Sequence, residues 1–304
     1  MNEQPEDVPS DGAVATPGAS AEADAFALVL LCLAGMAATI VFVSWPQLDL
    51  EVARLFVDES NRFFLARHPV PRLFNTLINV LAVVLILFSI AGIAYTAIGR
   101  RTFVGYGPRA FGFVFASVVI GPGLIANVLF KNEWGRARPR QIIEFGGTAD
   151  FTPALALADQ CVRNCSFVAG DASLAYATLA IALLAPAAVR VRWIAIAILF
   201  GTFIGFIRII QGAHFLSDVV FAGIFVSLTV VLLRGFIMEG RWGGAALEQR
   251  LARAARLLSG AIAPAAAPAA AARREFWLRI LPGLKDFGVV SNGTPSRPSQ
   301  DSTE

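Results

Sequence analysis

Apolar residues lie in long blocks along this chain instead of alternating with polar residues. A helix that crosses a bilayer needs roughly 20 apolar residues. Every backbone polar group in lipid must be hydrogen-bonded within the protein, so such blocks predict spanning helices. The fifth of six blocks is short, and the stretch Ile209–Ala213 would extend it beyond Arg208. The six blocks are Leu28–Trp45, Leu73–Ile98, Ala110–Phe130, Ala172–Val189, Trp193–Ile207 and Phe215–Leu233.

The composition supports a membrane protein. Hydrophobic residues make up 56% of the 304 residues and charged residues 15%, whereas a soluble domain carries about 25% charged residues. So few charges cannot cover a water-exposed surface, which excludes an ordinary soluble domain. We therefore expect an all-α, polytopic membrane protein, a bundle of six transmembrane helices. Its expected partner is the bilayer and not nucleic acid, and the oligomeric state stays open.

The two ends of the chain differ from this bundle. Residues 1–24 hold acidic residues, Pro, Gly, Ser and Ala but no Lys or Arg, and predict a disordered acidic tail. Without a basic start, the first block is a retained helix and not a signal peptide. We expect the spanning domain at 25–236 and a cytoplasmic tail at 237–304. The tail would hold a basic amphipathic helix or a solvated extension at Arg241–Ser259, then an Ala/Pro linker and a disordered end.

Arginines in the short connections predict the orientation of the helices, because basic loops favour the cytoplasmic side. The connections after the second, fourth and sixth blocks would share that side if all six blocks span. The other three connections then face outward, although they also contain basic residues. The arginines on the expected cytoplasmic side are Arg100, Arg101, Arg109, Arg190, Arg192 and Arg234.

Ionisable residues next to spanning segments are costly and are functional candidates by default. Lys131 and Arg138 follow the third block directly. An ammonium point charge and a planar guanidinium suit phosphate oxygens. The alternative is a basic stripe that binds anionic headgroups without any chemistry.

Two more polar clusters lie at outward ends of blocks. Gly170 and Asp171 open the fourth block, where a glycine permits close approach to a ligand and a helix start binds anions. Asp171 could instead simply cap the helix. His214 and Asp218 lie four residues apart, and on a helix they would share one face. An Asp–His pair can make a nucleophile for phosphorus or a structural hydrogen bond. This cluster has too few ligands for a metal site.

Two of the clusters carry the signatures of a known family. Lys131, six residues and then Arg138-Pro139, followed later by Arg208, five residues, His214, three residues and Asp218, resemble the first and third motifs of the type 2 phosphatidic acid phosphatase superfamily. The resemblance covers about Ala25 to Leu233 and implies a membrane lipid phosphatase that needs no metal or other cofactor.

The resemblance also implies roles for single residues. Lys131, Arg138 and Arg208, with the backbone at Gly170, would bind the phosphate. His214 would attack phosphorus to form a phosphohistidine, and Asp218 would orient and activate it.

The second motif departs from the family pattern. The family has Pro-Ser-Gly-His where this chain has Val168-Ala169-Gly170-Asp171, so the usual acid is missing. Asp171 could replace that acid, although nearby arginines favour its carboxylate form. Otherwise the chain binds phosphorylated lipid without turnover, or passes the phosphoryl group to an acceptor other than water.

A second resemblance concerns the segment between the first two motifs. Glu144–Gly147 and Cys161–Phe167 are similar to bacterial relatives that act on lipid A-type phosphates, which implies such a substrate ahead of phosphatidic acid. The expected location is the bacterial inner membrane, with the active site facing the periplasm. An extracytoplasmic loop would permit a Cys161–Cys165 disulfide, while Cys32 in the first block is expected to pack.

Overall fold

The structure is a computed structural model that describes residues 17–66, 68–99 and 101–240. Two compact units divide the chain at Leu251, and the described residues all belong to the first. The predicted amphipathic helix, the linker, the disordered end and residues 1–16 of the predicted tail lie outside them. Within the described ranges the chain is helical, with isolated bridges in place of strands. The expected all-α, polytopic class is confirmed.

Five helices are long and apolar enough to cross a membrane by length and composition. They correspond to the first, second, third, fifth and sixth apolar blocks. Each contains 23–31 residues, which matches the requirement of a bilayer core. They span Ala21–Ser44 within α1 (Pro17–Ser44), Pro69–Gly99 (α3), Pro108–Glu133 (α4, η1 and α5), Ala187–Ile210 (α8) and Leu216–Met238 (α9 and η4).

The fourth block differs from the expected span. It forms the shorter apolar helix Gly170–Leu184, divided into α6 (Gly170–Tyr176) and α7 (Leu179–Leu184). The Thr178 hydroxyl donates to the Ala175 carbonyl at 2.6 Å where the helix is interrupted. The expected count of six full-length spans is therefore not met by length. The fifth block is extended at its start, back to Ala187, and past Arg208 as far as Ile210, short of the expected end at Ala213.

The third span changes helix type on its way to the site. After α4 (Pro108–Val118), residues Val119–Phe130 form the π-helix η1, and Lys131–Glu133 form α5. Pro122 lies inside η1 and has no N–H to donate, which removes one bond of a regular helix. The Asn127 side chain donates to the Pro122 carbonyl at 2.8 Å.

The first helix begins earlier than expected. α1 starts at Pro17, so residues 17–24 are helical and not part of a disordered tail. Asp24 is buried and forms an ion pair with Arg234, the first residue of η4 (Arg234–Met238). A buried carboxylate needs such a partner.

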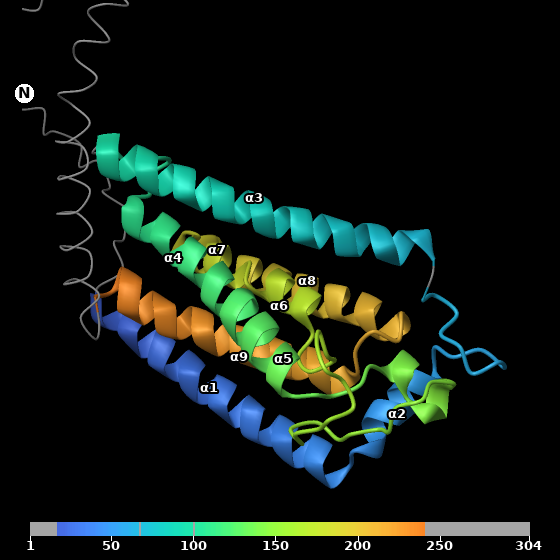
Figure 1. The fold of residues 1–304 in the computed structure, drawn as a ribbon. Helices are drawn as coiled ribbons and strands as arrows, with labels where there is room; N and C mark the ends of the chain where they lie inside the picture. Colours follow the sequence, from blue (N-terminus) through green and yellow to red (C-terminus); the bar gives the residue numbers. More distant parts are fainter. Residues whose placement is uncertain (1–16, 67, 100, 241–304) are drawn as a thin grey trace, which may run out of the picture. The chain divides into compact units, whose positions relative to one another are not determined.

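Small residues bring the helices around α6 into close contact. A β-carbon on Gly201 of α8 would lie 2.2 Å from the Tyr176 ring of α6, and one on Gly205 would lie 2.2 Å from Val219 of α9. Such close approach is typical of helix packing in membranes. Figure 1 shows α2 (Gln47–Arg54), α5 and the long loops gathered at one end of the long helices. That end carries the three polar clusters.

Candidate active site

Backbone hydrogen bonds join the three polar clusters. The Ser166 N–H donates to the Arg136 carbonyl at 2.8 Å, which links the second cluster to the first. The Ala169 N–H donates to the Asp218 carbonyl at 3.1 Å, which links the second to the third. The Arg140 N–H donates to the Gly212 carbonyl at 3.1 Å, which links the first cluster to the third. Segments far apart in sequence thus form one site.

His214 lies in the turn between α8 and α9, not on a helix as its spacing from Asp218 suggested. Gly212 makes this turn at φ +63° after α8 ends, in the left-handed region that glycine enters readily. His214 is 1% exposed, and its Nδ1 lies 2.7 Å from the Ser166 carbonyl oxygen. A carbonyl can only accept, so Nδ1 carries the proton and Nε2 has a free lone pair. Among the described residues, Nε2 has no hydrogen-bond partner.

Burial and the nearby positive charges keep the imidazole of His214 neutral. Burial above all, with the positive charges of Arg138 and Lys131, lowers the pKa of His214 to about 3, against the opposing effect of Asp218. A neutral imidazole with a free Nε2 has the lone pair that a nucleophile requires.

Asp218 supports His214 less directly than expected. Its Oδ2 lies 3.6 Å from His214 Nδ1, within ion-pair range but beyond a hydrogen bond. Oδ2 instead accepts the Ser166 hydroxyl at 2.5 Å and the Phe215 N–H at 2.8 Å. Asp218 therefore fixes the two neighbours of His214, the segment that supplies the accepting carbonyl and the start of α9.

Arg136 is the buried centre of this arrangement and was not assigned a role from the sequence. It is 0% exposed and donates to Asp218 Oδ1 at 2.6 Å, to Ser217 at 2.9 Å and to Asp49 Oδ2 at 2.8 Å. Its guanidinium lies 4.3 Å from the centre of the Phe215 ring. Asp49 on α2 also accepts the Ser217 N–H at 2.9 Å. Paired on two sides, Arg136 holds Asp218 in place.

Three further cations surround the histidine and leave hydrogen-bonding capacity for a ligand. Lys131 is the first residue of α5 near the end of the third span, Arg138 lies in the loop that follows, and Arg208 lies in the last turn of α8. Burial, and then the charges of Arg140 and Arg208, lower the pKa of Arg138 to about 10, so it stays charged at neutral pH. Like charges gathered at one buried place are unfavourable without an anion, which favours a phosphate ligand.

Asp171 and Gly170 border the same cations at the start of α6. Asp171 Oδ2 lies 2.9 Å from Arg208 Nε, an ion pair whose N–H direction does not meet hydrogen-bond geometry. Arg208 also donates to Gln211 at 2.7 Å. A β-carbon on Gly170 would lie 2.7 Å from Lys131 Nζ, so only glycine lets the lysine lie across the helix start.

The remaining histidine lies apart from these contacts. His68 is exposed, and its Nδ1 accepts the Val70 N–H at 3.3 Å. In the part of the chain that the structure describes, no three His, Cys, Asp or Glu residues are grouped so that they could hold a metal ion.

Comparison with known proteins identifies the family. The model of the PAP2 superfamily matches residues 110–239, which contain all three clusters. Over 213 residues the chain is 32% identical to a protein named lipid A 4'-phosphatase from Francisella tularensis subsp. novicida, an alignment that covers 67% of this chain and 92% of that protein. The chain belongs to the PAP2 superfamily.

Two rhizobial proteins of the same name match a shorter part of this PAP2 chain. The one from Rhizobium leguminosarum is 41% identical over 104 residues, 34% of this chain and 45% of that protein. The one from Rhizobium etli is 40% identical over 103 residues, 34% of this chain and 40% of that protein. No solved structure matches the chain. The family expected from the two signatures is confirmed.

The PAP2 site also contains residues that sequence reasoning missed. Asp49 follows the first apolar block, where an ionisable residue is a candidate by default, so its position was a usable signal. Arg136 lies between Lys131 and Arg138, but the first motif assigns roles only to those two positions. The carbonyl of Ser166 has no signal in the sequence, because any residue supplies one.

Proposed function

We propose that the chain is a metal-independent phosphatase that removes a phosphate monoester from a membrane lipid through a phosphohistidine at His214. The observation that carries this proposal is the free Nε2 of a buried, neutral His214 beside three cations. The names of the three relatives favour a lipid A-type substrate, in which the phosphate is attached to a sugar headgroup.

The proposed reaction has two steps. Asp171 takes up a proton from solvent when the lipid phosphate binds Arg208. His214 Nε2 attacks phosphorus in line, the bond from phosphorus to the lipid oxygen breaks, and Asp171 gives that proton to the departing oxygen. Water then attacks the phosphohistidine, the P–N bond breaks, and the Asp171 carboxylate accepts the proton of that water. Inorganic phosphate leaves, Asp171 returns the proton to solvent, and the site is back in its starting state.

Lys131, Arg138 and Arg208 would stabilise the charge on the transferring group. Their fixed positive charges lie in a water-poor site, where such preorganised groups have their largest effect. This supports a reaction without a metal ion, because the cations neutralise the charge that Mg²⁺ neutralises in other phosphoryl transfers.

Asp171 stands where the family pattern has the histidine that acts as the acid. It is the first ionisable side chain of α6, and it reaches the phosphate-binding Arg208 at 2.9 Å. A carboxylic acid beside an arginine that binds the phosphate would lie next to the leaving oxygen that it has to protonate. Bound phosphate would also give Arg208 a second anionic partner.

The first experiment measures phosphate release from lipid A, phosphatidic acid, phosphatidylglycerophosphate and undecaprenyl pyrophosphate in detergent micelles without added metal. We expect wild type to hydrolyse lipid A and His214→Ala to be inactive. Rapid acid-free quenching with ³²P-labelled substrate should trap phosphohistidine in wild type alone. Specific lipid binding without turnover of any of these lipids would contradict the phosphatase and favour a noncatalytic binder.

A second comparison tests Asp171. A p-nitrophenyl leaving group needs no protonation, whereas a sugar alkoxide does. We expect Asp171→Asn to form phosphohistidine from p-nitrophenyl phosphate, with a burst of p-nitrophenol, but not from lipid A. Equal loss of phosphohistidine formation with both substrates would show that Asp171 positions Arg208 and does not act as the acid.

A further inference from the structure

A small disulfide-closed loop lies against the phosphate-binding cations. Cys161 and Cys165 are bonded, with their Cα atoms 5.6 Å apart, and they enclose three residues. The loop is fixed at its second cysteine, which is buried and whose N–H donates to the Lys131 carbonyl at 3.0 Å. None of the three motifs of the family includes this loop, and the proposed reaction steps do not use it.

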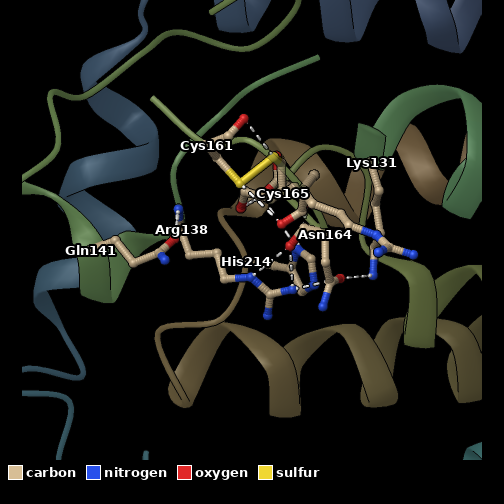
Figure 2. The surroundings of a disulfide bond; sticks show 10 residues. Lys131, Arg138, Gln141, Cys161, Asn164, Cys165 and His214 are labelled. Carbon is tan, nitrogen blue, oxygen red and sulfur yellow. Dashed lines mark hydrogen bonds and ion pairs between the residues drawn. A yellow bond between two sulfur atoms is a disulfide. The ribbon is translucent and has the colours of Figure 1, made fainter. Parts of the chain in front are cut away.

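Asn164 is the residue of this loop that contacts the cations. Its backbone carbonyl accepts from Arg138 Nη2 at 2.8 Å and from Nε at 3.3 Å. Its side-chain Oδ1 accepts from Arg138 Nη2 at 3.0 Å and from Lys131 Nζ at 3.4 Å. Figure 2 shows Asn164 between Arg138 and Lys131, with the His214 ring beside them. One residue thus bridges two of the three cations.

The backbone of the loop explains why asparagine suits this position. Asn164 has φ +54°, in the left-handed region that asparagine tolerates better than most residues. This conformation turns its carbonyl and its side-chain oxygen toward the same guanidinium. A five-residue ring closed by a disulfide restricts the alternatives to this turn.

We propose that Asn164 is a positioning residue for the phosphate subsite and that the Cys161–Cys165 disulfide holds it there. Asn164 fixes one edge of the Arg138 guanidinium, and Nη1 on the other edge has no hydrogen bond among the described residues. The ammonium of Lys131 has three N–H donors and gives one to Asn164, so two stay available. The inference rests on the proposed function only in taking phosphate as the ligand of these cations.

Asn164→Gly tests the side chain alone, because glycine keeps the left-handed backbone and its carbonyl. We expect the inhibition constant of inorganic phosphate and the KM for lipid phosphate to rise about tenfold, the size of a hydrogen bond to a charged group. The unfolding temperature should stay unchanged. Asn61→Gly is the matched control, since Asn61 has the same φ of 54° in another exposed loop.

Dithiothreitol tests the disulfide, which is reduced to two thiols as the reagent becomes its cyclic disulfide. Cys161 is partly exposed and open to attack. Reduction, and separately the Cys161→Ser/Cys165→Ser variant, should weaken phosphate binding at least as much as Asn164→Gly does. The effects should be less than additive, because both changes break the side-chain contacts of Asn164. Cys32→Ser should leave the response to dithiothreitol unchanged.

Wild-type phosphate inhibition in Asn164→Gly, or in protein whose thiols are shown to be free by mass, would overturn the inference. Additive losses would also overturn it, because they would give the disulfide an effect separate from Asn164. A parallel readout needs no turnover: inorganic phosphate should raise the unfolding temperature of oxidised wild type more than that of Asn164→Gly. If no lipid is hydrolysed, the proposed function fails while this readout still decides the role of Asn164.

Discussion

The imidazole of His214 is held in one protonation state by its surroundings. The Ser166 carbonyl fixes the proton on Nδ1, and burial with the nearby cations lowers the pKa to about 3. A histidine with an ordinary pKa near 6.5 would be partly protonated in mildly acidic conditions and would lose its nucleophilic lone pair. The same shift makes the folded state sensitive to acid.

We therefore expect His214 to reduce stability as pH falls from about 6.5 toward 3. In this window the unfolded histidine binds a proton and the folded one does not, so the free energy of unfolding falls by up to about 1.4 kcal/mol per pH unit. Above pH 6.5 the effect vanishes. Thermal unfolding in detergent at pH 7.5, 6 and 5 should show a smaller decline for His214→Gln than for wild type. His68→Gln is the control, and parallel declines in His214→Gln and wild type would refute the assignment.

Gly170 should be essential for the position of Lys131. In Gly170→Ala the new methyl group would lie 2.7 Å from Lys131 Nζ and 2.6 Å from Asn127 Oδ1, so the lysine must move. We expect kcat/KM to fall by up to about 100-fold, as misplaced binding groups cause, with little loss of stability. Gly112→Ala on α4 is the control, because a β-carbon there meets nothing within 4 Å. Steady-state kinetics of both variants would decide, and equal activities would contradict this account.

At the scale of the elements, Arg136 links helix α2 to helix α9. Asp49 belongs to α2, whereas Ser217 and Asp218 belong to the first turn of α9. All three accept hydrogen bonds from one fully buried guanidinium. An ion pair and hydrogen bonds thus connect the short α2 to the start of α9, where the site lies.

Asp49→Ala should weaken this link and leave Arg136 with one carboxylate partner. Breaking a buried ion pair costs about 3–5 kcal/mol, so the unfolding temperature should fall together with kcat. Glu51→Ala is the matched control, since Glu51 is exposed on the same helix. Thermal unfolding and turnover would be measured on the same preparations. A fall in activity equal to that of Glu51→Ala would show that α2 does not support the site.

Apolar blocks predicted the helices well because a span depends on length and hydropathy, which are local properties. They failed where a single residue changes the backbone. Pro122 lies in the π-helical part of the third span, and the fourth block ends at Leu184 because the backbone is extended at Ala185 and Pro186. Neither effect alters the apolar pattern, so no block boundary could indicate it.

The residues of the site, like the helices, could be predicted only where a local sequence pattern marks them. Lys131, Arg138, Arg208, His214 and Asp218 were predicted because their spacing forms two signatures, and the structure brings them together. Their supporting contacts depend on tertiary structure instead. The Ser166 carbonyl on Nδ1, and not the Asp218 carboxylate, makes the hydrogen bond to His214, and only the folded chain reveals it.

At the scale of the whole molecule, polar contacts lie at both ends of the helices described here. The Asp24–Arg234 ion pair joins the first part of α1 to the end of the last span, Leu216–Met238. The site lies where α1 ends and α9 begins, which is the other end of the same two helices. If arginine-rich connections face the cytoplasm, the site and its disulfide face the periplasm, where disulfides persist.

Cysteine labelling tests this orientation with two exposed loop positions in a Cys32→Ser background. Leu157→Cys lies in the loop of the active site, and Thr102→Cys lies in the connection between α3 and α4. We expect a membrane-impermeant maleimide to label Leu157→Cys in cells with a permeabilised outer membrane. Thr102→Cys should react only after the inner membrane is also opened, because its loop follows the positive-inside rule. The reverse pattern would place the site in the cytoplasm, where the Cys161–Cys165 disulfide would not persist.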